Sequence, residues 1–246
     1  MFDFSNLSAR EKLIVAVDVP TQEAAEKIII PLAQYVGFMK IGLQMITAIG
    51  PPAAINLVRF SRGYVMLDGK FNDIPHTMAG ATLAASQQSV EMLTVHASAG
   101  VEAMKAAVQN AGLTKILAVT VLTSIDADKC LSIFGDFPEK KVVRFATMAL
   151  KAGIHGIVCS PKEVEAIRAI PEFNKFIVVC PGIRLKDQVI ENDDQARKMT
   201  PYEAIRAGAD LIVVGRPITS SQNPTAMAQR VIEEIAEAMA PTRTAA

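Results

Sequence analysis

A dense run of charged residues follows one of the apolar segments of the chain. The run 67–77 carries Asp68, Lys70 and Asp73, while Asp18 and Lys40 lie at the end of, or within, two earlier apolar segments. Side chains two positions apart on a strand face the same side, so Asp68 and Lys70 are expected to point together. Lysines interleaved with aspartates keep each other ionised and form a charge-balanced network. Any one of these residues could make a salt bridge at the rim of the fold. Burying several charges together costs free energy, however, and such a set is typical of a functional site. The set therefore predicts a reaction site.

A second group of residues near the C-terminus has the character of an anion site. The sequence Gly215-Arg216-Pro217-Ile218 follows the apolar segment 211–214. Glycine permits close approach of a ligand to the backbone, and proline is favoured at the first position of a helix, whose N–H groups attract anions. Arg184 and Gln195 belong to the polar stretch 182–200 and could bind the same group. The pattern predicts a phosphate site.

Eight short segments rich in β-branched and other apolar residues recur along the chain, each followed by a helix-compatible stretch. The segments are 13–17, 38–41, 64–67, 91–95, 116–121, 156–159, 176–179 and 211–214. Continuous apolar segments are typical of parallel strands covered on both faces, and stretches such as 22–33, 101–111, 141–152 and 162–170 have helical spacing. This order predicts an α/β fold, a (β/α)8 TIM barrel, whose active site lies at the carboxyl ends of the strands. An open doubly wound sheet is the alternative.

The chain is expected to form a single barrel domain over residues 1–246, because no linker or shift in composition divides it. The stretch 182–200 is polar and has no apolar periodicity, so we expect a mobile loop that grips the phosphate. Residues 241–246 are expected to be a frayed tail.

Composition narrows the class of protein. Of 246 residues, 25 are Lys or Arg and 25 are Asp or Glu, a balance that argues against a nucleic-acid or membrane-surface partner. The three cysteines lack metal-ligand spacing, and two of them, Cys159 and Cys180, end apolar segments where buried thiols are usual. No leader pattern or membrane-length apolar segment is visible, which predicts a cytoplasmic protein.

The ordered motifs resemble those of the orotidine 5′-phosphate decarboxylase family. They are Val-Asp-Val-Pro at 17–20, Lys-Ile-Gly at 40–42, Asp-x-Lys-x-x-Asp-Ile-Pro-x-Thr at 68–77, Pro-Gly-Ile-Arg at 181–184, Asp-Asp-Gln at 193–195 and Gly-Arg-Pro-Ile at 215–218. The resemblance spans about residues 13 to 224, nearly the whole chain. The Asp-x-Lys-x-x-Asp part by itself marks only a wider superfamily.

The resemblance implies removal of carbon dioxide from a small-molecule nucleotide, orotidine 5′-phosphate, to give uridine 5′-phosphate, without a cofactor or a metal ion. It implies a catalytic tetrad with Lys70 as the proton donor, a ribose-binding aspartate, a pyrimidine-reading segment and a phosphate grip. The tetrad is Lys40, Asp68, Lys70 and Asp73, and the ribose-binding aspartate is Asp18. The pyrimidine-reading segment contains Thr123 and Ser124, and the phosphate grip consists of Arg184, Gln195, Gly215 and Arg216. It also implies a homodimer in which Asp73, Ile74 and Thr77 enter the neighbouring site.

Two residues depart from the family pattern. Gly69 stands where leucine is usual, and His76 where asparagine is more frequent. Gly69 is expected to face away from the site and to loosen the strand. His76 is expected to lie in a loop or subunit contact. His96 is expected to make a structural hydrogen bond, and His155 to be structural.

Two other functions remain open at this stage. Superfamily relatives that act on keto-sugar phosphates use Asp-x-Lys-x-x-Asp with a magnesium ion, partly held by an acidic residue on the second strand. Lys40 occupies that position here and would repel the metal. The other possibility is a phosphate-ligand-binding protein that has lost catalysis, against which the complete tetrad argues.

Overall fold

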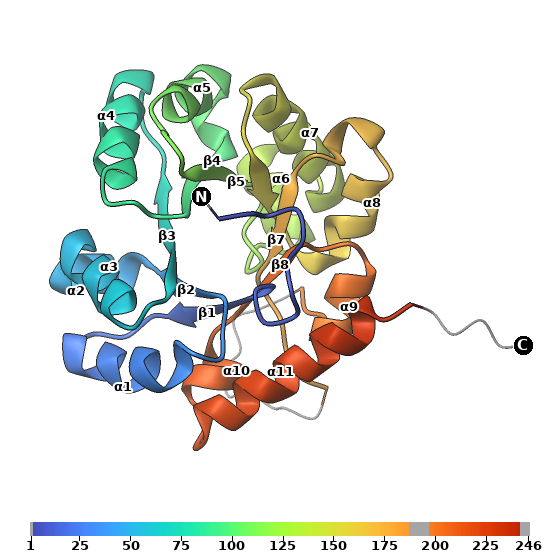
Figure 1. Cartoon of the computed structure of the whole chain (residues 1–246). Coiled ribbons are helices and arrows are strands. Elements are labelled where there is room, and N and C mark those ends of the chain that lie inside the picture. The colour runs from blue at the N-terminus through green and yellow to red at the C-terminus, as the bar shows by residue number, and fades with distance from the viewer. Residues whose placement is uncertain (1, 187–196, 242–246) are drawn as a thin grey trace, which may run out of the picture.

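The computed structural model describes residues 2–186 and 197–241. In these parts of the chain, eight parallel strands form a closed barrel in sequence order (Figure 1). Pairing of β1 with both β2 and β8 closes the sheet, which confirms the predicted TIM barrel and rules out the open-sheet alternative. The strands are β1 (Leu13–Val17), β2 (Phe38–Ile41), β3 (Tyr64–Phe71), β4 (Met92–His96), β5 (Lys115–Val119), β6 (Gly156–Val158), β7 (Ile177–Cys180) and β8 (Leu211–Val214).

Helices surround the strands on the outside of the barrel (Figure 1). They are α1 (Gln22–Leu32), α2 (Leu43–Ile49), α3 (Pro51–Phe60), α4 (Pro75–Ser86), α5 (Val101–Gln109), α6 (Ala127–Phe134), α7 (Pro138–Lys151), α8 (Val164–Arg168), α9 (Pro201–Arg206), α10 (Arg216–Thr219) and α11 (Pro224–Met239). Their starts follow ordinary capping rules. Thr21 caps α1, and Thr200 with Glu203 forms a capping box at α9, so otherwise unpaired N–H groups are satisfied.

The alternation of side chains along the strands separates two apolar layers. One layer packs between strands and helices, and the other fills the barrel interior. The interior layer includes Ile14, Ala16, Phe38, Met66, Met92, Leu117, Val179, Leu211 and Val213. Lys40 lies two residues beyond Phe38, and Asp68 lies two beyond Met66, so the same period of two carries charged side chains into the barrel mouth.

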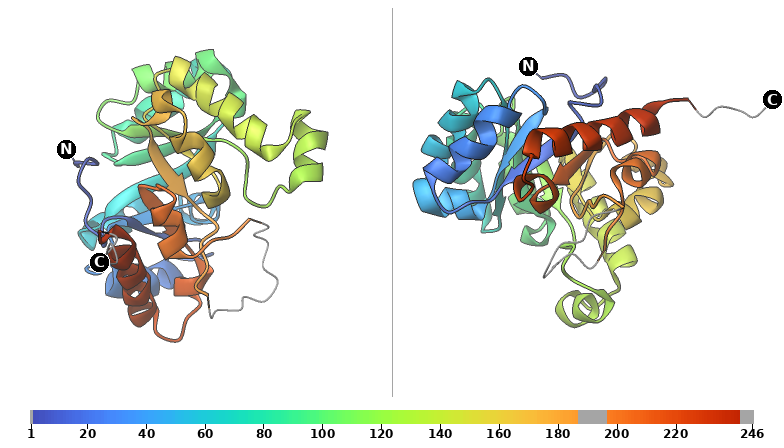
Figure 2. Two further views of the ribbon diagram at one scale, coloured as in Figure 1. Left: turned by 90° about the vertical axis from the view of Figure 1, so that its right-hand side faces the viewer. Right: turned by 90° about the horizontal axis from the view of Figure 1, so that it is seen from below.

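Aromatic rings cluster at the opposite, N-terminal end of the barrel. The Phe2 ring lies 4.8 Å from Phe38 and 4.6 Å from Tyr64 between centroids, in edge-on contacts, and Phe4 joins the cluster. Both views of Figure 2 show the N-terminal segment at one end of the barrel and α6 projecting from the other. The N-terminal segment therefore packs over the starts of the strands and leaves the carboxyl ends clear.

The predicted elements agree with the structure except at several boundaries. The strands at 13–17, 38–41 and 211–214 are confirmed to the residue, whereas β3 continues to Phe71 and β5 ends at Val119 rather than at 121. The helix expected at 162–170 is shorter, because Pro161–Glu163 forms a 3₁₀ turn before α8. Most of the predicted loop and of the predicted tail falls on residues 187–196 and 242–246, outside the described residues. None of the helices described in the structure is long and apolar enough to cross a membrane.

Candidate active site

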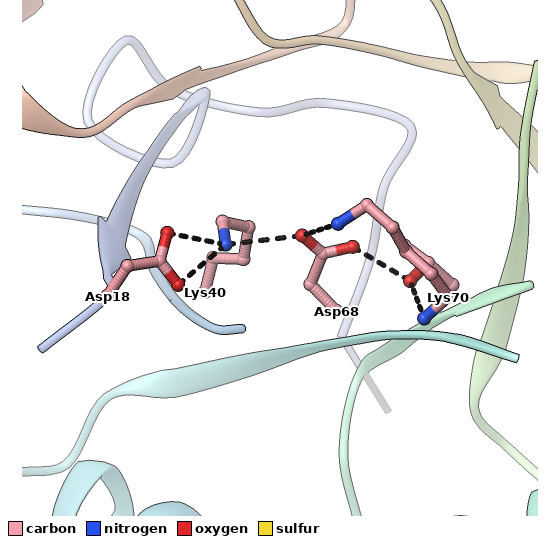
Figure 3. A network of polar contacts seen from close by, with 5 residues as sticks. Asp18, Lys40, Asp68 and Lys70 are labelled. Carbon is pink, nitrogen blue, oxygen red and sulfur yellow. Dashed lines mark hydrogen bonds and ion pairs between the residues drawn. The ribbon is translucent and has the colours of Figure 1, made fainter. Parts of the chain in front are cut away.

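Four charged side chains form a row across the mouth of the barrel (Figure 3). The Lys40 Nζ lies 3.1 Å from Asp18 Oδ2 and 3.2 Å from Asp68 Oδ2, and the Lys70 Nζ lies 2.6 Å from the same Asp68 oxygen. Asp18 follows β1, Lys40 belongs to β2, and the other two belong to β3. The barrel closure therefore brings together residues that are 52 positions apart in sequence, from 18 to 70.

The central pair of this row is buried and ionised. Lys40 and Asp68 are 8% and 6% exposed. Burial alone would raise the pKa of Asp68, but Lys40, Lys70 and the hydroxyl of Thr94 lower it below its ordinary value of 3.8. Burial would likewise lower the pKa of Lys40, yet Asp68 and Asp18 raise it above 10.5. Both groups consequently carry charge throughout the neutral pH range.

The local backbone at Lys70 departs from a regular strand. Its φ of 48° lies in the left-handed region, and the β3–β4 register shifts between Leu67 and Phe71. Asp68 and Lys70 do meet, but the simple alternation used to predict it does not hold across this bulge. Gly69 was predicted to face away from the site. A Cβ built on it would lie 2.6 Å from the Phe71 ring, and this ring packs against the outer apolar layer, which agrees with that orientation.

Thr94 fixes this irregular segment and was missed by the sequence reasoning. Its buried hydroxyl donates to Asp68 Oδ1 at 2.8 Å and accepts the backbone N–H of Lys70 at 2.9 Å. One side chain thus holds both the carboxylate and the backbone that carries the ammonium group. The signal was present, because Thr94 lies two residues after the inward-facing Met92 and so occupies the inward register.

Asp73 stands outside the row within this chain. Its Oδ1 accepts the backbone N–H of Ile74 at 2.7 Å, where the chain turns into α4. Asp73, Ile74 and Thr77 are exposed, and Ile74 retains 65% of its surface. Lys40, Asp68 and Lys70 of the predicted tetrad therefore lie together with Asp18. The fourth member, Asp73, is close to Lys70 in sequence but lies on the surface.

Two adjoining cavities open beside the charged row. One, of about 230 Å³, is lined by Lys40, Met66, Asp68, Lys70, Val119, Val121, Leu122, Thr123, Ser124, Val158, Cys159, Pro181 and Val213. The other, of about 320 Å³, is lined by Ala16, Asp18, Lys40, Pro181, Gly182, Arg184, Val213, Gly215, Arg216 and Thr219. Lys40, Pro181 and Val213 belong to both, so the cavities share a wall.

The predicted binding residues divide between these cavities. Thr123 and Ser124 line the first, and Arg184, Gly215 and Arg216 line the second together with Asp18. Gly215 is the N-cap of α10, the short helix expected from the Gly-Arg-Pro sequence. Gln195 lies outside the described residues. The cavity of about 230 Å³ thus has both apolar and polar lining residues, and the adjoining cavity of about 320 Å³ has arginines that suit an anion.

The histidines take different positions. His155 lies at the opposite end of the barrel, where its Nδ1 accepts the backbone N–H of Ile116 at 3.0 Å, which agrees with a structural role. His96 ends β4, and burial together with Lys70 lowers its pKa. The described residues include no hydrogen-bond partner for the His96 ring, so the hydrogen bond expected there is not seen within them. His76 is exposed in the first turn of helix α4, so it does not lie in a loop as expected, because Pro75 starts the helix one residue earlier.

The acidic side chains of the mouth are engaged by lysine. The carboxylates of Asp18 and Asp68 both contact the ammonium of Lys40. In the described part of the chain, no three His, Cys, Asp or Glu side chains are grouped to hold a metal ion. Cys130, Cys159 and Cys180 are buried free thiols, in agreement with the sequence expectation.

A closed (β/α)8 barrel with ion-paired residues and cavities at the carboxyl ends of its strands defines a TIM-barrel enzyme. Residues 11–231 match the family model described as orotidine 5′-phosphate decarboxylase / HUMPS family. The chain therefore belongs to this family.

Individual relatives give the same result. The chain is 43% identical over 242 residues to the orotidine 5′-phosphate decarboxylase of Moorella thermoacetica, covering 93% of this chain and 94% of that one. It is 45% identical over 223 residues to the enzyme of that name from an Anaeromyxobacter species, covering 90% and 96%. A crystal structure of orotidine 5′-phosphate decarboxylase from Lactobacillus acidophilus superposes with a TM-score of 0.77 at 30% identity, covering 91% and 98%.

Proposed function

We propose that this chain decarboxylates orotidine 5′-phosphate to uridine 5′-phosphate without a cofactor or a metal ion. The observation that carries the proposal is the row Asp18–Lys40–Asp68–Lys70 at the wall of the cavity lined by Thr123 and Ser124. Fixed charges in a partly water-excluded site stabilise charge that develops during a reaction. The relatives named orotidine 5′-phosphate decarboxylase support a reaction in which that charge is a carbanion.

The two cavities suggest how the nucleotide would lie. The pyrimidine ring would occupy the cavity of about 230 Å³, and the ribose and phosphate would occupy that of about 320 Å³. Asp18 would then bind the ribose, and Arg184, Gly215 and Arg216 the phosphate, with Gln195 assigned to the same group by resemblance. The shared wall at Lys40 would place the scissile bond near the charged row.

Lys70 is proposed as the proton donor. In the reaction, the bond between the ring carbon and the carboxylate breaks, carbon dioxide leaves, and the electron pair remains on the ring carbon. The Lys70 ammonium would stabilise that pair and then transfer a proton to it, which balances the charge. Asp68 would face the departing carboxylate, and Lys40 would hold Asp68 through their contact of 3.2 Å. Repulsion between two carboxylates disfavours the bound substrate relative to the transition state.

We further propose a homodimer that completes the tetrad. Asp73, Ile74 and Thr77 are exposed at the start of α4, so all three are accessible to a second subunit. In the proposed dimer these residues enter the neighbouring site, where Asp73 contacts the charged row of the other subunit. The predicted cytoplasmic location belongs to the same proposal.

The test is loss of orotidine 5′-phosphate absorbance by the purified protein, with and without EDTA. Rapid loss that EDTA does not change, with uridine 5′-phosphate as the product, is the expected result. Loss that EDTA abolishes would indicate metal-dependent chemistry instead. Binding of the nucleotide without turnover would indicate a phosphate-ligand-binding protein.

A further inference from the structure

A buried ion pair lies beside the site and has no part in the chemistry proposed above. Arg197 and Glu163 are 9% and 3% exposed, and the Arg197 Nη1 donates to Glu163 Oε1. Glu163 ends the 3₁₀ turn Pro161–Glu163 that follows β6, and Arg197 lies shortly before α9. The pair therefore joins segments that follow two different strands.

The same guanidinium reaches the segment that lines the proposed pyrimidine cavity. The Arg197 Nη2 donates to the carbonyl oxygens of Val121 and Leu122, at 3.3 Å and 3.0 Å. These carbonyls directly precede Thr123 and Ser124, and all four residues line the cavity of about 230 Å³. Arg197 thus holds the backbone of a segment that lines the cavity, while Arg197 itself is not part of the cavity lining.

Arg197 is also connected to the phosphate side of the site. Two residues after it, Met199 forms a parallel β-bridge with Ile183, and its carbonyl accepts the backbone N–H of Arg184 at 3.0 Å. Arg184 lines the cavity of about 320 Å³. A short path of hydrogen bonds therefore runs from the proposed phosphate grip to the proposed pyrimidine segment.

The pair is poorly explained as a contribution to stability. Glu163 Oε2 and Arg197 Nε are buried and have no hydrogen-bond partner among the residues that the structure describes. Burying an ion pair with unsatisfied atoms is often no better for stability than an apolar replacement. An arrangement of this kind at the back of a cavity is better explained by a need to fix the cavity wall.

We propose that Arg197, held by Glu163, is a positioning residue that fixes segment 121–124 for recognition of the pyrimidine. The proposal rests on the proposed function for the identity of the ligand. The link between Arg197 and the segment is a property of the free protein and can be tested without any ligand.

The chain offers a matched control at the other end of the barrel. Arg168 also pairs with a carboxylate, Asp210, at 2.6 Å, and also donates to two carbonyl oxygens, those of Gly208 and Phe176. These partners precede β7 and β8, at the ends of the strands away from the site. Arg168→Met removes the same set of interactions as Arg197→Met, but from a purely structural position.

Arg197→Met is expected to fold. Burial raises the pKa of Glu163 to about 7 even with Arg197 beside it, although Lys162 and Arg197 act against this and Glu139 adds to it. Without Arg197 the carboxyl can take up a proton instead of remaining as an unpaired buried charge. A second variant, Arg197→Lys, keeps a cation toward Glu163 but lacks the fork that reaches both carbonyls.

The first measurement is amide hydrogen exchange of the ligand-free variants. Arg197→Met is expected to accelerate exchange in segment 119–126, whereas Arg168→Met should accelerate it near residues 176–178 and 208–210 only. Exchange in segment 119–126 that is unchanged in Arg197→Met would overturn the link, whatever reaction the enzyme performs.

The second measurement is kcat and KM for orotidine 5′-phosphate and for orotidine, which lacks the phosphate. Arg197→Met is expected to lower kcat/KM for both substrates by about tenfold or more, since small displacements of a binding wall carry large penalties. Arg197→Lys should recover part of the loss, and Arg168→Met should retain wild-type kcat/KM while unfolding at a lower temperature. A loss confined to the phosphate-bearing substrate, or an equal loss in Arg168→Met, would overturn the positioning role. Absence of turnover by the wild-type protein would refute the proposed function, while the exchange result would still decide the link.

Discussion

The two ends of the barrel are built from the same strands, yet they place opposite kinds of side chain in the interior. At the N-terminal end, Phe38 meets Phe2 and Phe4 in an aromatic cluster, with ring centroids 4.8 Å apart for Phe2 and 6.0 Å for Phe4. Two residues further along β2, Lys40 lies between two carboxylates. The alternation of the strand determines only which side chains point inward, so the residue type determines whether an end supplies stability or chemistry.

Ion pairs differ between the ends in the same way. At the N-terminal end, Arg59–Glu91 and Arg168–Asp210 are partly exposed pairs whose arginines also bind backbone carbonyls. At the carboxyl end, Lys40 and Asp68 are buried. Burying a charge carries a large desolvation free energy, and the buried charges Lys40 and Asp68 lie beside the cavities of the candidate site.

The largest expected effect comes from removing the ammonium group nearest the proposed scissile bond. Lys70→Ala should lose nearly all turnover, at least about a hundredfold, because a positioned acid contributes that much or more. The fold should persist, since the Lys70 side chain is 28% exposed. Turnover and circular dichroism of the purified variant measure the two outcomes. Lys115→Ala, at the start of β5 and therefore at the N-terminal end of the barrel, is the control and should keep wild-type turnover. Substantial activity in Lys70→Ala would refute the assignment.

Glycine-to-alanine substitutions at the two ends of the barrel should have different effects, one on activity and the other on stability. A Cβ at Gly42 would overlap Asp18 Oδ1 and lie 2.8 Å from Lys40 Nζ, so Gly42→Ala should displace the Asp18 contact. We expect kcat/KM to fall by about tenfold or more. At the start of β6, a Cβ on Gly156 would instead overlap the backbone oxygen of Ile177. Gly156→Ala should reduce thermal stability while the folded enzyme keeps its kcat/KM. The reverse pattern of effects would contradict the division of roles.

Removal of an aromatic ring from the N-terminal cluster should change stability alone. Phe4 contacts both Phe2 and Phe38 but is only partly buried, so Phe4→Ala should lower the free energy of unfolding by less than the roughly 1.5–3 kcal/mol of a fully buried ring, about 1–2 kcal/mol. Urea denaturation measures this loss. Because the cluster lies at the end away from the charged row, kcat and KM should not change. A large change in KM at full folding would show that the two ends are coupled.

The smallest expected effect is a response to pH. The folded pKa of Asp68 lies below 3.8, so its ionisation contributes stability that is present above 3.8 and is lost as the pH falls through the folded value. The folded pKa of Lys40 lies above 10.5, so its contribution is present below 10.5 and is lost as the pH rises through the folded value. The difference in unfolding free energy between wild type and Asp68→Asn should therefore be constant from roughly pH 5 to 7 and shrink in stronger acid. A slope within that range would indicate that Asp68 titrates there, whereas a slope at higher pH would report Lys40, whose pKa Asp68 raises.

Much of the barrel could be predicted from the sequence because its strands are local features. Segments such as 13–17 and 211–214 are apolar throughout and fixed by their own composition, so even their ends were correct. The bulge at Lys70 could not be predicted, since it depends on the hydroxyl of Thr94 from the neighbouring strand. Arg197 meets a carboxylate 34 positions away, and a pairing of that separation has no local signature.

In the candidate site, too, residues with a local sequence signal could be predicted, and residues that depend on distant contacts could not. Asp18, Lys40, Asp68 and Lys70 could be selected because charge in an apolar segment is conspicuous, and Arg216 because it follows the last strand. The assignment of Asp73 to the site of a neighbouring subunit came only from the family resemblance. Thr94 was overlooked because threonine is an ordinary strand residue, and only its inward register marks it out.

The left-handed backbone at Lys70 limits how this site can be transplanted. A designer who copied the Asp-x-Lys sequence onto a regular barrel strand would obtain the right residues at φ values near −120°, with the ammonium aimed differently. The copied motif would need the register shift and the threonine of the adjacent strand as well, since these hold the φ of 48°. The transferable unit is consequently a pair of strands rather than a stretch of sequence.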